Sequence, residues 1–259
     1  MKLKYIVVVC IAFLLSFVIT QSNVFSQIKF NNKTYIAVQT PSTEQYSPIG
    51  DKNRENILII LDASGSMSEK IGNKRKIDIA KDSIINVLNQ VSDNEKIGLR
   101  VYGHVMDFWG LKACEASELK VAISEGSKNL IKEELLKIKP TGATPISYSV
   151  EQALKYDFTG LSGKKRIILV TDGMETCGQS PCDLAVSLMK KGIDLKIDVI
   201  GFDIQDKSSL PQLKCISLAT KGKFYTANDS QELVNSLENT LNIETNVSGE
   251  IVKDMPNQK

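Results

Sequence analysis

Five oxygen-bearing side chains occupy three short segments of this chain, each where a predicted strand ends or a helix begins. They are Asp62, Ser64, Ser66, Thr144 and Asp172. The first three follow the apolar run 57–61, which is typical of a strand buried on both faces, and ligands of open α/β sheets bind at the carboxyl ends of strands. Carboxylate and hydroxyl oxygens are ligands for a small hard cation. The pattern predicts a Mg²⁺ site, with Mn²⁺ and Ca²⁺ as alternatives.

The threonine of this set has a competitor, because Thr141 lies three residues before Thr144. Thr144 precedes Pro145, and proline suits the first position of a helix. This places Thr144 at an N-cap that faces the upper edge of the sheet. We therefore expect Thr144 to be the ligand.

The order Asp-x-Ser-x-Ser, a distant Thr and a distant Asp resembles the metal-ion-dependent adhesion site of von Willebrand factor type A domains, over about residues 55–243. Other segments are similar to exported bacterial members of that family: Tyr102-Gly103-His104, Thr144-Pro145-Ile146, 172–177, Pro181-Cys182 and 213–216. The resemblance implies that the two serines, and in one state the threonine, ligate the metal directly. It implies that the aspartates ligate it directly or through water.

The donor count indicates how such a site would work. Three hydroxyls and two carboxylates cannot complete the octahedral shell of Mg²⁺, so at least one position keeps water. An Asp or Glu of a partner protein can replace that water, as the resemblance implies. We therefore expect a non-enzymatic, metal-dependent protein-binding or adhesion module of the cell envelope.

An enzyme is the alternative, namely a metal-dependent hydrolase or phosphoryl-transfer enzyme that uses the strand-end aspartates. The Asp-x-Asp motif of such enzymes is absent, because its third position is Ser64 here. Gly-x-Ser-x-Gly and phosphate-binding glycine motifs are also absent. The only histidine, His104, follows an apolar strand, where a structural role competes with contact to the site or the partner.

Strand and helix patterns alternate along the chain. Expected strands are 57–61, 97–102, 119–123, 166–170, 195–202 and 223–226. Expected helices are 75–91, 145–156, 181–191, 209–220 and 229–241, and a further helix that begins after Ser127 and ends before Pro140. Ser127 is expected to cap its helix, and Asp229 with Glu232 forms a capping box at the start of the last one. This rhythm predicts an α/β fold with a doubly wound, mostly parallel sheet, one antiparallel edge strand and helices on both faces.

The N-terminal segment predicts export. The start Met1-Lys2-Leu3-Lys4 is basic, and 5–20 is apolar but short for a membrane span. The segment Val24-Phe25-Ser26 has small side chains at the positions that a signal peptidase reads, which predicts cleavage before Gln27. An uncleaved anchor is the alternative, and lipid attachment at Cys10 is disfavoured. The predicted organisation is a signal peptide (1–26), a linker or extension (27–53), the main domain (54–243) and a tail (244–259). We therefore expect a periplasmic or extracellular protein that is not inserted in the membrane after cleavage.

Charge excludes several partners. The chain has 32 basic and 30 acidic residues, so loss of Lys2 and Lys4 leaves it formally neutral. Neither nucleic acid nor an anionic membrane is indicated as a partner. The basic run Lys74-Arg75-Lys76 is interpreted as the solvated face at the start of a helix.

Four of the five cysteines remain after cleavage, an even number that favours disulfides in an exported chain. In the expected fold Cys114, Cys177 and Cys182 gather near the edge with the aspartates, and the helix with Cys215 can pack beside that of Cys182. We expect the pairs Cys114–Cys177 and Cys182–Cys215, although spacing alone cannot fix connectivity. The alternatives are a zinc site with His104 and free thiols.

Overall fold

The computed structural model describes residues 25–30, 33–38, 54–105 and 112–243, and the chain divides into two units, Met1–Ile49 and Gly50–Lys259. In the first unit, β1 (Phe25–Phe30) and β2 (Lys33–Val38) pair as an antiparallel hairpin, where the sequence predicted only a polar extension beyond Gln27. The apolar run 5–20 and the tail 244–259 lie outside the described residues. Within the described residues, no helix has the length and apolar character needed to cross a membrane.

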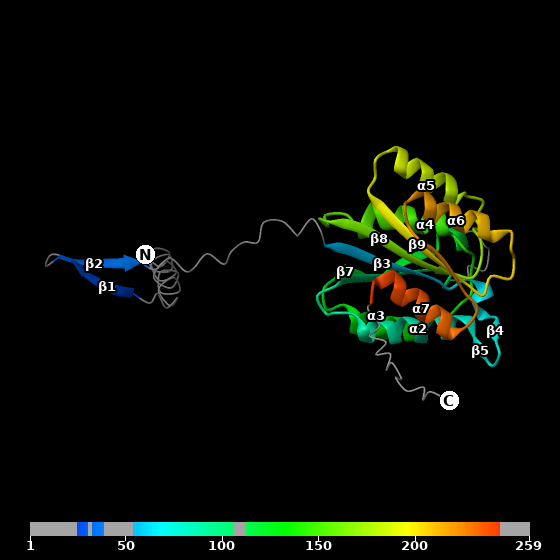
Figure 1. Cartoon of the computed structure of the whole chain (residues 1–259), viewed down its shortest axis with the longest axis horizontal. Helices are drawn as coiled ribbons and strands as arrows, with labels where there is room; N and C mark the ends of the chain where they lie inside the picture. Colours follow the sequence, from blue (N-terminus) through cyan, green and yellow to red (C-terminus); the bar gives the residue numbers. More distant parts are fainter. Residues whose placement is uncertain (1–24, 31–32, 39–53, 106–111, 244–259) are drawn as a thin grey trace, which may run out of the picture. The chain divides into compact units, whose positions relative to one another are not determined.

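The second unit is built on a six-stranded sheet (Figure 1). Its strands are β3 (Glu55–Asp62), β6 (Lys96–Tyr102), β7 (Ser117–Ser124), β8 (Lys164–Thr171), β9 (Leu195–Phe202) and β10 (Phe224–Ala227). They lie in the order β10-β9-β8-β3-β6-β7, and all neighbours are parallel except β7, which runs antiparallel to β6 at the edge. The predicted fold class is confirmed, including the antiparallel edge strand.

Six α-helices cover the two faces of this sheet (Figure 1). Helices α2 (Lys76–Gln90), α3 (Lys128–Lys137) and α7 (Ser230–Leu241) lie on one face; α4 (Ile146–Gln152), α5 (Pro181–Lys190) and α6 (Ser209–Ala219) lie on the other. Strand β3 shows why its sequence is continuously apolar: Ile57, Ile59 and Leu61 enter one core, and Leu58 and Ile60 enter the other. The central strand is therefore buried on both sides, and only its end can carry polar side chains.

Two predicted helix starts differ from the structure. Ser127 precedes α3, but its hydroxyl donates to the Ile97 carbonyl oxygen (2.6 Å) instead of capping the helix. Helix α4 begins at Ile146, one residue later than predicted, so Pro145 holds the cap position. The helical backbone then continues as a π-helix over Ala153–Asp157. By contrast, the Asp229 side chain caps α7 as predicted, accepting the Glu232 backbone N–H (2.9 Å).

Both predicted disulfides are present. Cys114 is bonded to Cys177 with their Cα atoms 5.4 Å apart, and Cys182 is bonded to Cys215 at 5.3 Å. The first bridge joins the segment after β6 to the loop after β8, and the second joins α5 to α6. The zinc and free-thiol alternatives for these four cysteines are therefore wrong.

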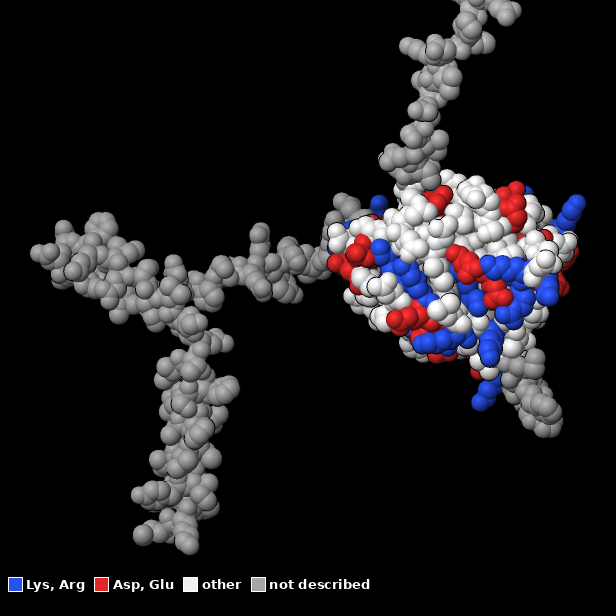
Figure 2. All heavy atoms as spheres, turned by 90° about the horizontal axis from the view of Figure 1, so that it is seen from below, with Lys and Arg blue, Asp and Glu red and all other residues white. Residues whose placement is uncertain are grey.

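Acidic and basic side chains are mixed on one face of the domain. Over the described residues of the face shown in Figure 2, Lys and Arg side chains alternate with Asp and Glu side chains. A face with mixed charges gives no broad field of one sign that would attract a polyanion. This agrees with the near-zero net charge of the sequence.

Candidate metal centre

Four of the five predicted ligands meet at one edge of the sheet. Strands β3 and β8 are parallel neighbours with Leu61 opposite Val170, so Asp62 and Asp172 emerge at the same edge. The Oγ atoms of Ser64 and Ser66 lie 3.1 Å apart, and Ser66 Oγ donates to Asp172 Oδ1 (2.7 Å). The loop after β3 thus contacts the loop after β8 through the hydrogen bond between Ser66 and Asp172.

Asp62 is fully buried, and hydrogen bonds fix both its oxygens. The Ser64 backbone N–H donates to Oδ1 (2.7 Å), while the hydroxyls of Tyr102 (2.9 Å) and Thr171 (2.7 Å) donate to Oδ2. Tyr102 and Thr171 are the last residues of the strands that flank β3. The three central strands therefore supply both the carboxylate and the donors that orient it.

Burial sets the protonation of the centre. It raises the pKa of Asp62 to about 6, with the charge of Asp172 adding to the effect and hydrogen bonds from Ser64 and Thr171 opposing it. Burial also raises the pKa of Asp172, against hydrogen bonds and charge from Ser66 and Lys76. The pKa of the Tyr102 hydroxyl lies well above its ordinary value because of burial and the nearby Asp62 carboxylate. Two buried carboxylates that resist ionisation form a place where a cation is stabilising.

The segment that leads to Thr144 lies against the loop after β3. Ser64 forms a parallel bridge with Gly142, and the Gly65 backbone N–H donates to the Gly142 carbonyl oxygen (2.9 Å). Gly103, at φ +71°, permits this approach, because a Cβ there would lie 2.6 Å from the Ala143 oxygen and from the Ser64 nitrogen. A side chain at position 103 would separate the two loops.

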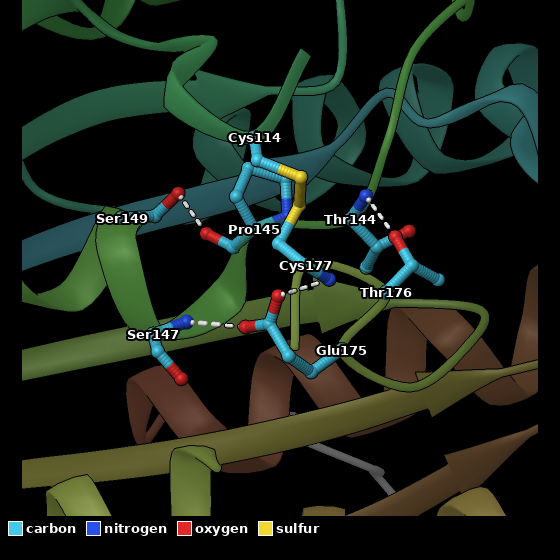
Figure 3. The surroundings of a disulfide bond; sticks show 8 residues. All are labelled: Cys114, Thr144, Pro145, Ser147, Ser149, Glu175, Thr176 and Cys177. Atoms are coloured by element: carbon cyan, nitrogen blue, oxygen red, sulfur yellow. Dashed lines mark hydrogen bonds between the residues drawn. A yellow bond between two sulfur atoms is a disulfide. The ribbon is translucent and has the colours of Figure 1, made fainter. Parts of the chain in front are cut away.

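Thr144 is held through its backbone by the loop after β8 (Figure 3). Its N–H donates to Thr176 Oγ1 (2.9 Å), and its carbonyl oxygen accepts the Thr176 N–H (3.2 Å). Glu175 accepts the backbone N–H groups of Ser147 (2.8 Å) and Cys177 (2.9 Å), so Glu175 serves the start of α4. The capping role predicted for Thr144 is therefore wrong.

Thr144 differs from the other predicted metal ligands in the contacts of its hydroxyl. Among the described residues, no hydrogen bond joins it to the other four predicted ligands, although the residue is 5% exposed and its loop is fixed between the other two. The Cys114–Cys177 disulfide lies beside this pairing (Figure 3) and ties the same loop to the segment after β6.

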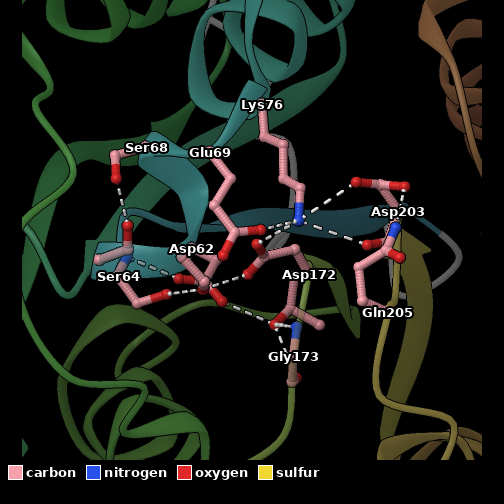
Figure 4. Close-up of polar contacts among 12 residues, drawn as sticks. Asp62, Ser64, Ser68, Glu69, Lys76, Asp172, Gly173, Asp203 and Gln205 are labelled. Atoms are coloured by element: carbon pink, nitrogen blue, oxygen red, sulfur yellow. Dashed lines mark hydrogen bonds and ion pairs between the residues drawn. The ribbon is translucent and has the colours of Figure 1, made fainter. Parts of the chain in front are cut away.

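Lys76 is the largest departure from the sequence interpretation. It was assigned to a solvated face, yet it is 2% exposed, and its Nζ lies 3.2 Å from Asp172 Oδ2. Glu69 Oε2 (2.9 Å) and Asp203 Oδ2 (3.2 Å) also contact the ammonium (Figure 4). Burial acts to lower the pKa of Lys76, but Glu69, Asp172 and Asp203 together raise it above its ordinary value. The centre therefore contains a fixed positive charge.

His104 belongs to a different contact. Its Nε2 lies 3.0 Å from Glu118 Oε2 on β7, and in the described part of the chain no hydrogen bond links it to the five predicted ligands. His104 therefore contacts an edge-strand carboxylate and not the proposed ligands.

The sequence could have indicated two of the residues that it missed. Tyr102 and Thr171 are polar residues that end apolar strands next to the strand of Asp62. Lys76 gave no such signal, because a lysine at the start of a helix is usually solvated.

The donor set fits a hard cation. Among the described residues, no group of three or more His, Cys, Asp or Glu side chains could hold a metal, so a site of softer ligands is not offered there. The centre has instead two carboxylates with neighbouring serine hydroxyls, and oxygen donors of this kind suit Mg²⁺, Mn²⁺ or Ca²⁺.

The fold, together with the polar residues at the carboxyl edge of its sheet, identifies the family of this protein. The sequence profile of the von Willebrand factor type A domain matches residues 56–240, and the chain belongs to that family. It is 30% identical over 187 residues to the uncharacterized protein YwmD of Bacillus subtilis (strain 168), covering 71% of this chain and 83% of YwmD.

Solved structures agree on the fold. The von Willebrand factor type A protein from Catenulispora acidiphila superposes with a TM-score of 0.58 at 19% identity, covering 73% of this chain and 42% of that one. Proximal thread matrix protein 1 from the mussel byssus, in a structure with a zinc-occupied MIDAS motif, gives a TM-score of 0.57 at 20% identity, with 73% and 45% covered. At such identities the likeness establishes the fold.

Proposed function

We propose that this protein is a metal-dependent protein-binding module of the cell envelope. It holds Mg²⁺ at an adhesion site and captures an Asp or Glu side chain of a partner protein. The proposed ligands are Asp62, Ser64, Ser66, Thr144 and Asp172.

One observation supports this most strongly: the chain of contacts from Ser64 to Ser66 to Asp172 at the carboxyl edge of the sheet. These oxygens lie on the loops after β3 and β8. The segment that contains Gly142 and Thr144 pairs with both of these loops. Hard oxygen donors that converge in this way, with room for water, suit Mg²⁺.

The geometry also favours an incomplete shell. Both Asp62 oxygens already accept hydrogen bonds, so Asp62 is suited to acting through a water molecule. The hydroxyls of Ser64, Ser66 and Thr144 are neutral donors. A cation held mainly by neutral ligands keeps most of its positive charge and attracts a carboxylate to the open position.

Binding rather than catalysis is the expected activity. Domains of this family are typically interaction modules, and His104, the only histidine of the chain, is paired with Glu118. We expect no metal-dependent turnover of phosphate or carboxylate esters. Two disulfides support export to an oxidising compartment, the periplasm or the cell exterior.

Calorimetric titration of the metal-free chain with Mn²⁺, followed by capture of envelope proteins on the immobilised chain, tests the proposal. We expect one Mn²⁺ site and captured partners that EDTA releases, with both lost in Asp62→Ala and Asp172→Ala. The matched control is Glu238→Gln, which removes a carboxylate on α7 that pairs with Gln90, away from the proposed ligands. Unchanged Mn²⁺ binding in the double variant Asp62→Ala/Asp172→Ala would contradict the assignment.

A further inference from the structure

The edge of the sheet that carries the proposed metal ligands also carries a buried lysine. Lys76 is the first residue of α2, and its side chain is 3% exposed. Lysine is rarely buried unless its charge is paired. Here the ammonium group contacts three carboxylates, and this pairing of its charge allows the side chain to be buried.

The three carboxylates come from three different segments. Glu69 follows the short helix Gly65–Ser68 after β3, Asp172 follows β8, and Asp203 follows β9 (Figure 4). Asp203 has a left-handed backbone (φ 48°), and its Oδ1 accepts a hydrogen bond from Gln205 Nε2 (2.6 Å). The ammonium group therefore links the loops that surround the centre.

Asp172 divides its two oxygens between neighbours. Oδ1 accepts the hydroxyl of Ser66, on the side of the proposed metal ligands, and Oδ2 lies 3.2 Å from Lys76 Nζ. The carboxylate is shared between the lysine and the site that would hold the metal. An opposite charge this close takes up part of the field that Asp172 would otherwise direct at a bound cation.

We propose that Lys76 is a positioning residue that sets the charge of the metal centre. Its ammonium neutralises Asp172, limits the affinity of the site for a divalent cation, and leaves the bound cation positive enough to accept a partner carboxylate. This inference rests on the proposed function, because it requires a metal at the centre.

The consequence for variants is opposite to that of losing a ligand. Without the ammonium, Glu69, Asp172 and Asp203 face one another with no counter-charge. Such a cluster destabilises the metal-free chain and attracts a divalent cation more strongly. A bound cation would then be more fully neutralised by Asp172 and would hold an external carboxylate less tightly.

The test compares metal-stripped wild type with Lys76→Met, Lys76→Gln and Lys76→Arg, using Mn²⁺ alone in calorimetry. We expect Lys76→Met and Lys76→Gln to bind Mn²⁺ about tenfold tighter or more, since each removes a positive charge beside Asp172. Lys76→Arg keeps the charge and should stay within about threefold of wild type. The matched control is Lys81→Met, a buried lysine on the same helix that contacts Asp78 and the Ile138 carbonyl oxygen instead.

Acetate provides the carboxylate probe. Its displacement of Mn²⁺-bound water, followed by water-proton relaxation, should need several-fold more acetate in Lys76→Met than in wild type. Lys76→Gln, whose amide can still donate to Asp172, carries the same comparison if Lys76→Met fails to fold.

Several outcomes would overturn the inference. Equal or weaker Mn²⁺ binding by the folded neutral variants would do so, as would equal tightening in Lys76→Arg or in Lys81→Met, or unchanged acetate displacement. These leave the proposed function intact. Absence of Mn²⁺ binding to wild type would overturn the proposed function and this inference with it.

Discussion

Removal of the Cys114–Cys177 disulfide should affect stability and metal binding together, whereas removal of Cys182–Cys215 should affect stability alone. The paired cysteines are 63 residues apart in the first bridge and 33 in the second. The chain-entropy relation gives losses of about 4.3 and about 3.7 kcal/mol on replacing each pair by serine. The two changes are therefore nearly equal as perturbations of folding.

The two bridges differ in what they hold. Cys177 directly follows Glu175 and Thr176, which bond to the start of α4 and to Thr144. The second bridge connects α5 to α6 and contributes no contact to the predicted ligands among the described hydrogen bonds. Since loss of a supporting contact commonly costs a metal site about tenfold in affinity, we expect that loss for Cys114→Ser/Cys177→Ser and almost none for Cys182→Ser/Cys215→Ser.

Urea unfolding in EDTA measures the first quantity, and calorimetry with Mn²⁺ under native conditions measures the second. The reasoning would be refuted if both double variants lost metal affinity to the same extent. It would also be refuted if the Cys114→Ser/Cys177→Ser chain, still folded, bound Mn²⁺ as tightly as wild type.

Four further outcomes can be measured. Tyr102→Phe removes the hydroxyl that donates to Asp62 Oδ2 and should lower the free energy of unfolding by about 1–2 kcal/mol in urea denaturation, with no change expected for the exposed Tyr156→Phe control. Burial raises the pKa of Asp62 from 3.8 to about 6. The contribution of this carboxyl group to the stability of the metal-free protein is therefore complete below about pH 4 and is lost as the pH rises through about 6. Because the metal needs the ionised carboxylate, Mn²⁺ affinity should rise roughly tenfold from pH 5 to pH 7, and an equal rise in Asp62→Asn would exclude Asp62 as the cause. We expect the mature protein to be exported and to begin at Gln27, and an intact mass that includes Met1 would support the anchored alternative.

The sequence was most informative where a pattern of apolar and polar residues is compatible with a single secondary structure. Strand β9 is predicted and found over 195–202, and the apolar run 57–61 lies within β3. Their alternation with helices leaves a doubly wound sheet as the natural arrangement. The same topology favours the observed Cys114–Cys177 pair without fixing it, because the segments after β6 and β8 begin at a common edge of the sheet.

Tertiary contacts decided what the sequence missed. Lys76 looks like any solvated lysine until Glu69, Asp172 and Asp203 are brought around it from positions up to 127 residues away. Ser127 and Thr144 have the residue types of helix caps, but neither caps a helix. The Ser127 hydroxyl donates to the Ile97 carbonyl oxygen, and the loop after β8 holds the backbone of Thr144. Local propensity cannot anticipate partners so distant in sequence.

Crystals of the chain soaked in Mn²⁺ test the central claim most directly, because anomalous scattering locates the metal. We predict one strong peak at the carboxyl edge of the sheet, about 2.2 Å from the hydroxyl oxygens of Ser64 and Ser66, with at least one coordinated water. The peak should be absent in Asp62→Ala/Asp172→Ala crystals and retained in Glu238→Gln crystals. No peak at this edge in the wild-type chain, or a peak held by other residues, would contradict the account.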